Sequence, residues 1–182
     1  MISEKQDLSA KNHIHSLWQK LATELVDIYD AHGVCAIVAS EVAAFAECTA
    51  VVGLSGPQER YYDVWVCRPT GKMEQTRWDA SKASFAPFLE ADGCTYQAKY
   101  SLSAPSLLNS ELWLLSRAGI LGCPLRVGAT IHEDNPQGIL CLVDPLDSSP
   151  LHRDNIGQIS LLIGTYLDRA QLRQHIHRQD IE

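Results

Sequence analysis

Six cysteines are the residues of this sequence best suited to chemistry, and their spacing argues against a shared centre. They stand 13 to 29 residues apart, at Cys35, Cys48, Cys67, Cys94, Cys123 and Cys141. No two form a Cys-x-x-Cys pair, the short spacing by which zinc sites and thioredoxin-like sites bring two thiolates to one centre. Most lie in or beside apolar segments, where a free cysteine packs as a small hydrophobic side chain. We expect reduced thiols in the core and no zinc site.

Thiol catalysis would require an accessible cysteine with a lowered pKa. Cys123 and Cys141 lie in the middle of the apolar runs GILGCPL and GILCLVD, where burial would raise the pKa of a thiol and hide it. Cys94, in ADGCTY, is the one cysteine with an exposed setting, and no second loop cysteine stands near it in sequence. We therefore expect no catalytic thiol.

Two pairs of histidines form a second candidate centre. His13 and His15 stand near the beginning of a predicted first helix, and His175 and His177 near the end of a predicted last helix. On a helix, residues two apart point roughly 200° away from each other, so neither pair can chelate one ion. Basic residues at the end of a helix are instead favoured by the helix dipole. We expect no metal site.

Composition and charge narrow the possible partners. With 182 residues, 46% apolar and 20% charged, the chain has the composition of one soluble globular domain. Fifteen basic against 22 acidic residues give a net charge of −7 without a basic patch, so we expect no nucleic-acid partner. The longest apolar runs fall far short of the roughly 20 residues of a membrane span, and the charged N-terminus lacks a signal-peptide pattern. These features favour a cytoplasmic protein.

Apolar periodicity predicts a long helix at each end of the chain. In residues 9–32 the apolar positions recur at spacings of three and four, which places them on one stripe. They are Ile14, Trp18, Leu21, Leu25 and Ile28. The last helix is expected to begin at Ser149, with Pro150 in its first turn, and to run to about Gln179. Its stripe has the same spacings, at Ile156, Ile159, Ile163, Tyr166 and Ala170.

Between these helices the pattern changes to that of strands. Gly33 interrupts the first helix, and an Ala-rich second helix follows over residues 34–47. Apolar, β-branched or alternating runs predict strands at 48–54, 61–67, 75–79, 120–127 and 137–143, with short helices at 84–91 and 106–118. Helices at both ends of a run of strands favour an α+β fold, with an antiparallel sheet and helices segregated to its faces.

Two stretches resemble the GAF domain. GILGCPLRVGATIHEDNPQGILCLVDPL followed by SPLHRDNIGQISLLIGTYLDRAQL is similar to its second half: an apolar strand with a Pro-Leu, a polar turn, a Gly-Ile-Leu strand, and a helix with an early acid, here Asp154. CTAVVGLSGPQERYYDVWVCR resembles its first hairpin, and the resemblance covers about Ala31 to Leu172. It implies a GAF-like (PAS-related) central antiparallel sheet of five to six strands, with long N- and C-terminal helices on one face and short helices or loops over the other.

The resemblance also implies an organisation and a function. We expect one GAF-like domain over residues 1–182, with an N-terminal helix at 1–32, a core at 33–147 and a C-terminal helix at 148–182 that continues into an output module. GAF domains are regulatory modules that bind small molecules or dimerise, so we expect a non-catalytic regulatory or sensory domain of a larger signalling protein. Two alternatives stay open: a stand-alone redox enzyme similar to the free methionine sulfoxide reductases, and a purely structural dimerisation module.

Aromatic residues mark the expected ligand site, because in a GAF architecture the segments from Tyr61 to Trp113 line or cover the concave face of the sheet. If Val64 and Val66 face the helical core, Trp65 faces the pocket. The predicted pocket residues are Trp65, Cys67, Trp78, Tyr96, Tyr100 and Trp113. The alternative is that these aromatic side chains fill the pocket themselves and leave no room for a ligand. No histidine lies in these segments to bind haem, and the chain lacks the Cys-His pair that attaches a bilin in phytochrome-like domains.

Both long helices carry more apolar surface than one sheet covers, which predicts a homodimer joined through them. The expected interface residues are Ile14, Trp18, Leu21, Leu25, Ile159, Ile163 and Tyr166. In the alternative, the two stripes pack on each other within one chain.

Overall fold

A six-stranded antiparallel sheet with strand order β3-β2-β1-β6-β5-β4 forms the centre of the molecule. The structure is a computed structural model and describes residues 2–56, 60–102, 105–125 and 138–179. The strands are β1 (Thr49–Ser55), β2 (Tyr61–Cys67), β3 (Met73–Asp79), β4 (Thr95–Ala98), β5 (Gly119–Leu125) and β6 (Gly138–Val143). The predicted α+β class and antiparallel sheet are confirmed.

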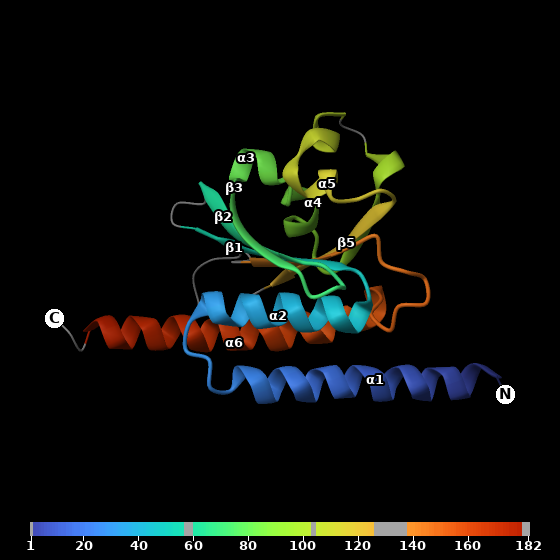
Figure 1. Cartoon of the computed structure of the whole chain (residues 1–182), viewed down its shortest axis with the longest axis horizontal. Helices are drawn as coiled ribbons and strands as arrows, with labels where there is room; N and C mark the ends of the chain where they lie inside the picture. The colour runs from blue at the N-terminus through green and yellow to red at the C-terminus, as the bar shows by residue number, and fades with distance from the viewer. Residues whose placement is uncertain (1, 57–59, 103–104, 126–137, 180–182) are drawn as a thin grey trace.

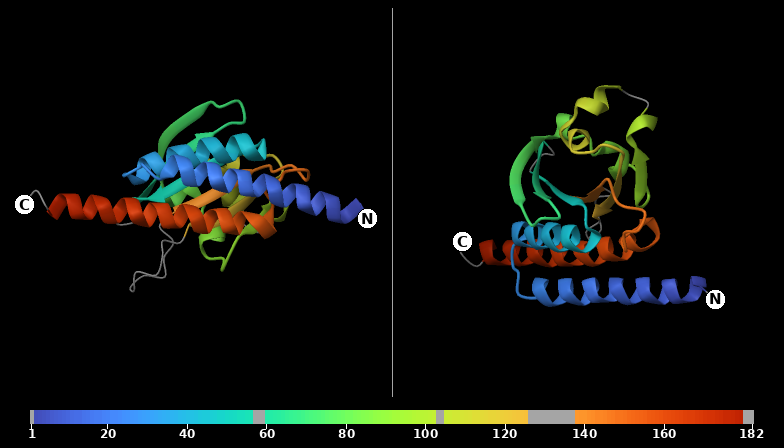
Figure 2. Two further views of the ribbon diagram at one scale, coloured as in Figure 1. Left: turned by 90° about the horizontal axis from the view of Figure 1, so that it is seen from below. Right: turned by 45° about the vertical axis from the view of Figure 1, so that its right-hand side comes forward.

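Three long helices lie on one side of this sheet, as Figures 1 and 2 show. They are α1 (Ile2–Leu25), α2 (Ala31–Ala46) and α6 (Arg153–Gln179). Helices α2 and α6 contact the sheet, and α1 lies against both of them. The remaining helices are short: α3 (Ala80–Ala83), α4 (Ala86–Leu89) and α5 (Glu111–Leu114), with the 3-10 turns η2 (Lys99–Ser101) and η3 (Pro105–Asn109). In Figure 1, α3, α4 and α5 lie on the side of the sheet opposite the long helices.

Alternation along the strands divides the interior into two cores. The helix-side core packs one set of strand residues against α1, α2 and α6: Ala50, Val52, Leu54, Trp65, Cys67, Leu121, Cys123, Leu125, Leu140 and Leu142. The aromatic-side core packs the alternate set against the short helices: Val51, Val64, Val66, Ile120, Ile139, Cys141 and Val143. Strands β1, β2, β5 and β6 therefore contribute to both cores, and the sheet is buried on both faces over these strands.

The break between the first two helices is set by a capping side chain. Helix α1 ends at Leu25, and α2 begins at Ala31 because Asp30 accepts a hydrogen bond from the backbone N–H of Gly33 over 2.7 Å. Gly33, expected to interrupt the helix, therefore lies inside the first turn of α2. The prediction was wrong because a glycine can also stand in a first turn when the cap precedes it.

Other predicted boundaries shift for similar local reasons. Ser84, expected to begin a helix, ends α3 with a left-handed φ of 58°. Residues 106–118 form a 3-10 turn and one α-helical turn rather than a single helix, and α6 begins at Arg153 rather than at Ser149. Strand β4 was not predicted. The predicted strand ends at Val127 and Gln137 lie outside the described residues.

Candidate functional site

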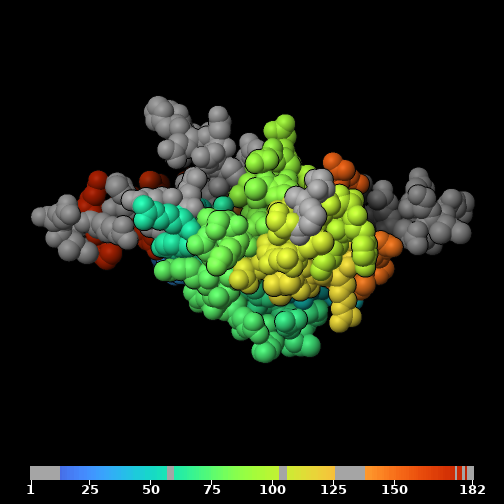
Figure 3. Space-filling model, turned by 90° about the horizontal axis from the view of Figure 1, so that it is seen from above, coloured from blue at the N-terminus to red at the C-terminus, as the bar shows by residue number. Residues whose placement is uncertain are grey.

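Four aromatic side chains cover the face of the sheet where the sequence predicts a ligand. We call Trp78, Phe85, Phe88 and Trp113 the aromatic cluster, and all four are buried. The rings of Trp78 and Phe85 stack with centroids 5.8 Å apart, and those of Phe88 and Trp113 with centroids 6.2 Å apart. In Figure 3, atoms of β3 and of the short helices cover this side of the molecule. The protein's own rings thus occupy the space between the sheet and the short helices.

Hydrogen bonds at the ends of the short helices hold the aromatic cluster in place. Asp79 accepts a hydrogen bond from the backbone N–H of Ser81 over 2.9 Å, which caps α3 directly after Trp78. Lys99 Nζ donates to the carbonyl oxygens of Trp113 at 3.0 Å and Ser116 at 2.5 Å, which fixes the end of α5 beside β4. A helix of one turn satisfies few of its own backbone groups, so these bonds supply what it lacks.

Phe88 packs directly on the backbone of β5. A Cβ atom added to Gly122 would collide with the Phe88 ring. Glycine is therefore required at this strand position, because it lets an aromatic ring approach the main chain.

Trp113 carries an unsatisfied donor inside this core. Its Nε1 is buried and has no hydrogen-bond partner among the residues that the structure describes. Leaving a buried N–H without a partner costs about 1–3 kcal/mol. A polar ligand atom or a water molecule would satisfy it.

Asp144 closes the loop that leads from α5 into β5. Its carboxylate accepts hydrogen bonds from the Ser116 hydroxyl (2.7 Å) and from three successive backbone N–H groups, those of Arg117 (2.8 Å), Ala118 (2.8 Å) and Gly119 (3.0 Å). Partial burial opposes ionisation, but these hydrogen bonds outweigh it and lower the pKa of Asp144 below its usual value. The carboxylate thereby ties the short-helix side of the molecule to the end of β6.

Trp65 and Cys67 lie on the other face of the sheet from the aromatic cluster, in the helix-side core. The ring of His32, on α2, meets Trp65 edge-on with centroids 5.2 Å apart. The prediction that Trp65 faces the ligand side, with Val64 and Val66 toward the long helices, is wrong. Alternation determines which residues share a face, but it does not say which face the helices cover.

The other predicted pocket residues are divided between core and surface. Trp78 and Trp113 belong to the aromatic cluster, whereas Tyr96 and Tyr100 are 47% and 91% exposed. The six predicted residues are therefore not brought together around one pocket. Ligand binding itself stays a prediction.

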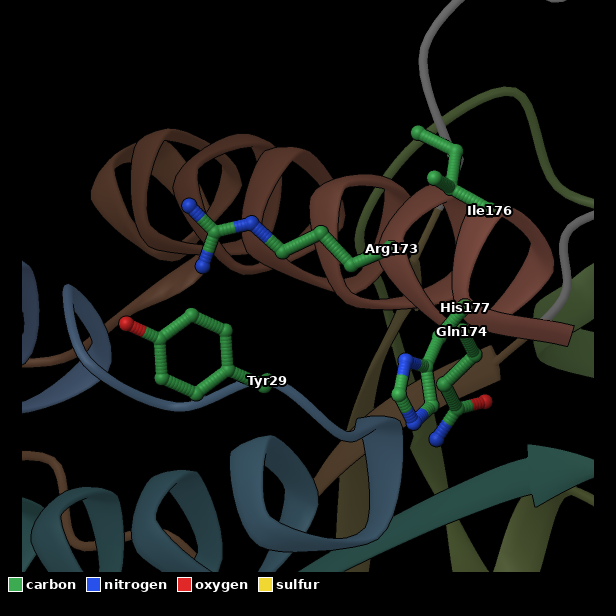
Figure 4. A pocket seen from close by; sticks show the side chains of 5 residues that line it. All are labelled: Tyr29, Arg173, Gln174, Ile176 and His177. Carbon is green, nitrogen blue, oxygen red and sulfur yellow. The ribbon is translucent and has the colours of Figure 1, made fainter. Parts of the chain in front are cut away.

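A cavity of about 460 Å³ lies on the helix side, between the α1–α2 connection and the C-terminal half of α6 (Figure 4). It is lined by Tyr29, Arg173, Gln174, Ile176 and His177. The Arg173 guanidinium carbon lies 4.5 Å from the centre of the Tyr29 ring, and its Nη1 is buried with no hydrogen-bond partner in the described part of the chain. Sequence reasoning missed this site because Tyr29 and Arg173 are far apart in the chain and neither belongs to a motif.

Most residues predicted for a dimer interface pack inside one chain. Four of them are fully buried in the helix-side core: Leu21, Leu25, Ile159 and Ile163. The Tyr166 hydroxyl donates to the carbonyl oxygen of Ala22 over 3.2 Å and joins α6 to α1. Ile14 is half-buried against the same core, and Trp18 is 40% exposed. The two apolar stripes thus meet within the chain, as the alternative proposed, and these four residues are not available on its surface.

Four cysteines are buried free thiols: Cys35, Cys48, Cys67 and Cys141. Burial, with smaller contributions from Asp30 and Asp63, raises the pKa of Cys35 to about 12. Burial likewise raises the pKa of Cys48 to about 12 and the pKa values of Cys67 and Cys141 above the usual range. None of these four is placed to act as a thiolate nucleophile.

The remaining two cysteines, Cys94 and Cys123, form a disulfide bond. The expectation that all six thiols are reduced is therefore wrong for this pair. Their sequence separation of 29 hides the pairing, because the pairing depends on the register of a strand, β4, that was not predicted.

Metal clusters and membrane-spanning helices can be judged for the described residues only. Within them, no three His, Cys, Asp or Glu side chains lie close enough together to hold a metal ion. Over the same ranges, no helix is both long and apolar enough to cross a membrane.

The fold is similar to those of solved GAF domains. The GAF domain of a phosphoenolpyruvate-protein phosphotransferase from Coxiella burnetii has a TM-score of 0.63 at 11% identity, over 90% of this chain and 97% of that one. The A. aeolicus nlh2 GAF domain in an inactive state has a TM-score of 0.59 at 10% identity, over 90% and 99%. Residues 122 to 287 of a methyl-accepting chemotaxis protein have a TM-score of 0.57 at 10% identity, over 84% and 95%.

No family model matches the sequence, and no curated protein matches it by sequence. The likeness is therefore one of overall fold rather than of shared residues. The chain therefore has the fold of a GAF domain.

Proposed function

We propose that the chain is a non-catalytic regulatory domain of a signalling protein, and that it acts by associating with a second copy of itself through α6. Solved structures with the same fold come from a phosphotransferase and a chemotaxis protein, which supports a regulatory role. Four of the six cysteines are buried free thiols with raised pKa values, which argues against these four as nucleophiles of the sulfoxide-reductase alternative. The observation that carries the proposal is an apolar surface on α6.

This α6 outer surface consists of Leu161, Leu172 and Ile176, which are 70%, 60% and 50% exposed. At 100° per residue the three side chains fall within about 60° of one another around the helix. Ile159 and Ile163, which pack against the sheet, lie about 160° from Leu161 by the same geometry. Helix α6 thus carries three exposed apolar side chains opposite its buried stripe, and Thr165 and Asp168 stand between Leu161 and Leu172 on the same side.

A second copy of the chain is the partner that fits this surface best. Leu161 and Leu172 are eleven residues apart, close to three turns, so they stay in line along a nearly straight helix. Such a line can pair with its own copy across a two-fold axis, the commonest arrangement of homo-oligomers. The interface predicted from the sequence is thereby moved from the buried side of α6 to its outer side.

Sedimentation velocity of charged variants tests the proposal. We expect a dimer for the wild type at micromolar concentration and monomers for Leu161→Glu and Leu172→Glu, because a carboxylate would be buried at the centre of the contact. Leu114→Glu is the matched control, since Leu114 is 64% exposed on α5, on the other side of the sheet. A monomeric wild type, or dimers in both α6 variants, would contradict the proposal.

Small-molecule binding is a second candidate function, and the cavity beside Tyr29 favours it. An aromatic ring with a guanidinium group over it suits a planar or anionic ligand. Native mass spectrometry would detect a retained ligand, and a panel of nucleotides and dicarboxylates would then be titrated against Tyr29→Leu. Tyr100→Leu is the control, because that side chain is 91% exposed and lies in η2. Binding that Tyr29→Leu leaves unchanged would exclude this cavity.

A further inference from the structure

The disulfide bond joins the edge of the sheet to its interior. Cys94 directly precedes the edge strand β4, and Cys123 lies within β5. The register pairs Thr95 with Gly122, so its next step brings Cys94 opposite Cys123. Their Cα atoms are 4.2 Å apart, close to the separation of opposed residues that do not hydrogen-bond to each other in an antiparallel pair. The bond therefore extends the pairing of a four-residue strand by one step.

The same cysteine is in contact with the first turns of α6. Arg153 Nε donates a hydrogen bond to the carbonyl oxygen of Cys94 over 3.2 Å. One turn later Gly157 lies beside Cys94, where an added Cβ atom would be 3.8 Å from its Sγ. The beginning of α6 thus lies against a segment that the disulfide attaches to the sheet.

Among the six cysteines, this pair is the one placed for thiol–disulfide exchange. Cys94 is half-buried at the surface, whereas Cys123 is buried in the helix-side core. The four free thiols are buried away from solvent, where exchange partners do not reach them.

We propose that Cys94 and Cys123 form a redox-responsive bridge, reduced by a dithiol, whose opening loosens the packing of the first turns of α6 on the sheet edge. Helix α6 begins beside this bridge and carries the α6 outer surface further along. A change in the packing of its first turns would therefore link the redox state of the bridge to association of two copies. That second link rests on the function proposed above, whereas the opening of the bridge does not.

The chemistry is an ordinary exchange in which atoms and electrons balance. A thiolate of the dithiol attacks Cys94 Sγ, a mixed disulfide forms, and Cys123 leaves as a thiolate that takes up a proton. The second thiol of the reductant then attacks the mixed disulfide and releases Cys94, which is protonated in turn. Two electrons and two protons pass to the protein, and the dithiol becomes a cyclic or internal disulfide.

Alkylation and hydrogen exchange of the same samples test the proposal. Without dithiothreitol we expect no label on Cys94 or Cys123, even after denaturation, and with it we expect both to be labelled. Amide exchange in residues 91–98 and 153–160 should become at least several-fold faster on reduction, with α2 unchanged as internal reference. The unfolding temperature should fall by roughly 5–10 °C, since a closed loop of about 30 residues is opened.

Two variants separate the bridge from other effects of the reductant. Cys94→Ala/Cys123→Ala should exchange like the reduced wild type and no longer respond to dithiothreitol, and Cys48→Ala, which removes a buried free thiol, should respond like the wild type. Six free thiols in the oxidised, denatured protein would overturn the proposal. So would reduction that leaves exchange of 153–160 unchanged. A protein that is monomeric in both states would contradict the proposed association but not the redox response.

Discussion

The two faces of the sheet are covered in opposite ways. On the helix side, α2 presents a continuous row of small side chains: Ala31, Val34, Cys35, Val38, Ala39, Val42, Ala43 and Ala46. On the other side, α3, α4 and α5 are four residues long each, and the aromatic cluster does most of the covering. A long helix buries a face through many small contacts, whereas a one-turn helix has room for one or two side chains, which must be large. Stability should therefore be spread out on one face and concentrated on the other.

The largest expected effect is at the centre of the aromatic cluster. Trp113→Ala should lower the free energy of unfolding by about 3–5 kcal/mol, because it leaves a cavity that short helices cannot close. Val38→Ala, at an equally buried position of α2, should lower it by roughly 2 kcal/mol, the loss of two buried carbon groups. Urea denaturation measures both, with Tyr100→Ala as a surface control near zero. Equal losses for Trp113→Ala and Val38→Ala would remove the contrast between the faces.

The next effect comes from the close approach of a ring to the backbone. Gly122→Ala should lower the free energy of unfolding by about 1–3 kcal/mol, because the new methyl group meets the Phe88 ring, which has packed neighbours behind it. Gly93→Ala is the matched control, since nothing lies within 4 Å of a Cβ added there and its φ is not in the left-handed region. Chemical denaturation of the two variants side by side gives the comparison. A Gly122→Ala protein as stable as the wild type would show that the short helices shift and make room for the added methyl group.

A third effect tests how the short-helix side is tied to β6. Asp144→Asn should lower the free energy of unfolding at pH 7 by about 1 kcal/mol. The side-chain NH₂ of Asn would face a backbone N–H group whose hydrogen bond the Asp144 carboxylate accepts, and two donors cannot bond to each other. Asn tolerates the left-handed φ of 49° at this position as Asp does, so the substitution changes the charge and one hydrogen-bonding group without straining the backbone.

The pH dependence of this effect has a definite sign. The pKa of Asp144 is lowered in the folded state, so its stabilisation is fully present above the unfolded value of about 3.8 and is lost as the pH falls through the lower folded value. The difference between wild type and Asp144→Asn should hence shrink below pH 3.8 and stay constant above pH 5. A difference that grows on acidification would contradict the assignment.

What the sequence predicts follows the same division. The long helices were found because their apolar residues repeat over several turns, and the antiparallel sheet because its strands alternate or are uniformly apolar. Four residues leave no comparable period, so α4 and α5 were predicted only within the longer ranges 84–91 and 106–118, and α3 and β4 were not predicted. The positions of these short elements depend on single hydrogen bonds, such as those of Asp79 and Lys99, and no local sequence pattern predicts such bonds.

The candidate sites were predicted less well than the elements, for a physical reason. A stripe such as Ile159 and Ile163 says that a surface is buried, but not whether its partner belongs to the same chain. Alternation places Trp65 opposite Val64, but not on a known face. The Cys94–Cys123 bond and the Tyr29–Arg173 contact join distant segments, so both need the register and packing of the finished fold.

The smallest expected effect lies on the surface of the helix side, where contacts are many and individually weak. Lys20 Nζ of α1 lies 2.5 Å from Glu41 Oε2 of α2, and this hydrogen bond raises the pKa of Lys20 against a smaller opposing effect of burial. Because Lys20 is exposed, Lys20→Met should change the free energy of unfolding by at most about 0.5 kcal/mol at low salt. At 1 M salt, where the screening length is about 3 Å, even that difference should vanish. Urea denaturation at both salt concentrations measures this change in the free energy of unfolding. Lys72→Met is the matched control, because Lys72 pairs with Glu74 on the edge strand β3. A loss above 1 kcal/mol for Lys20→Met would mean that this one ion pair holds α1 in place, rather than the buried side chains of Leu17, Leu21 and Leu25. The conclusion that stability on the helix side is spread over many weak contacts would then be wrong.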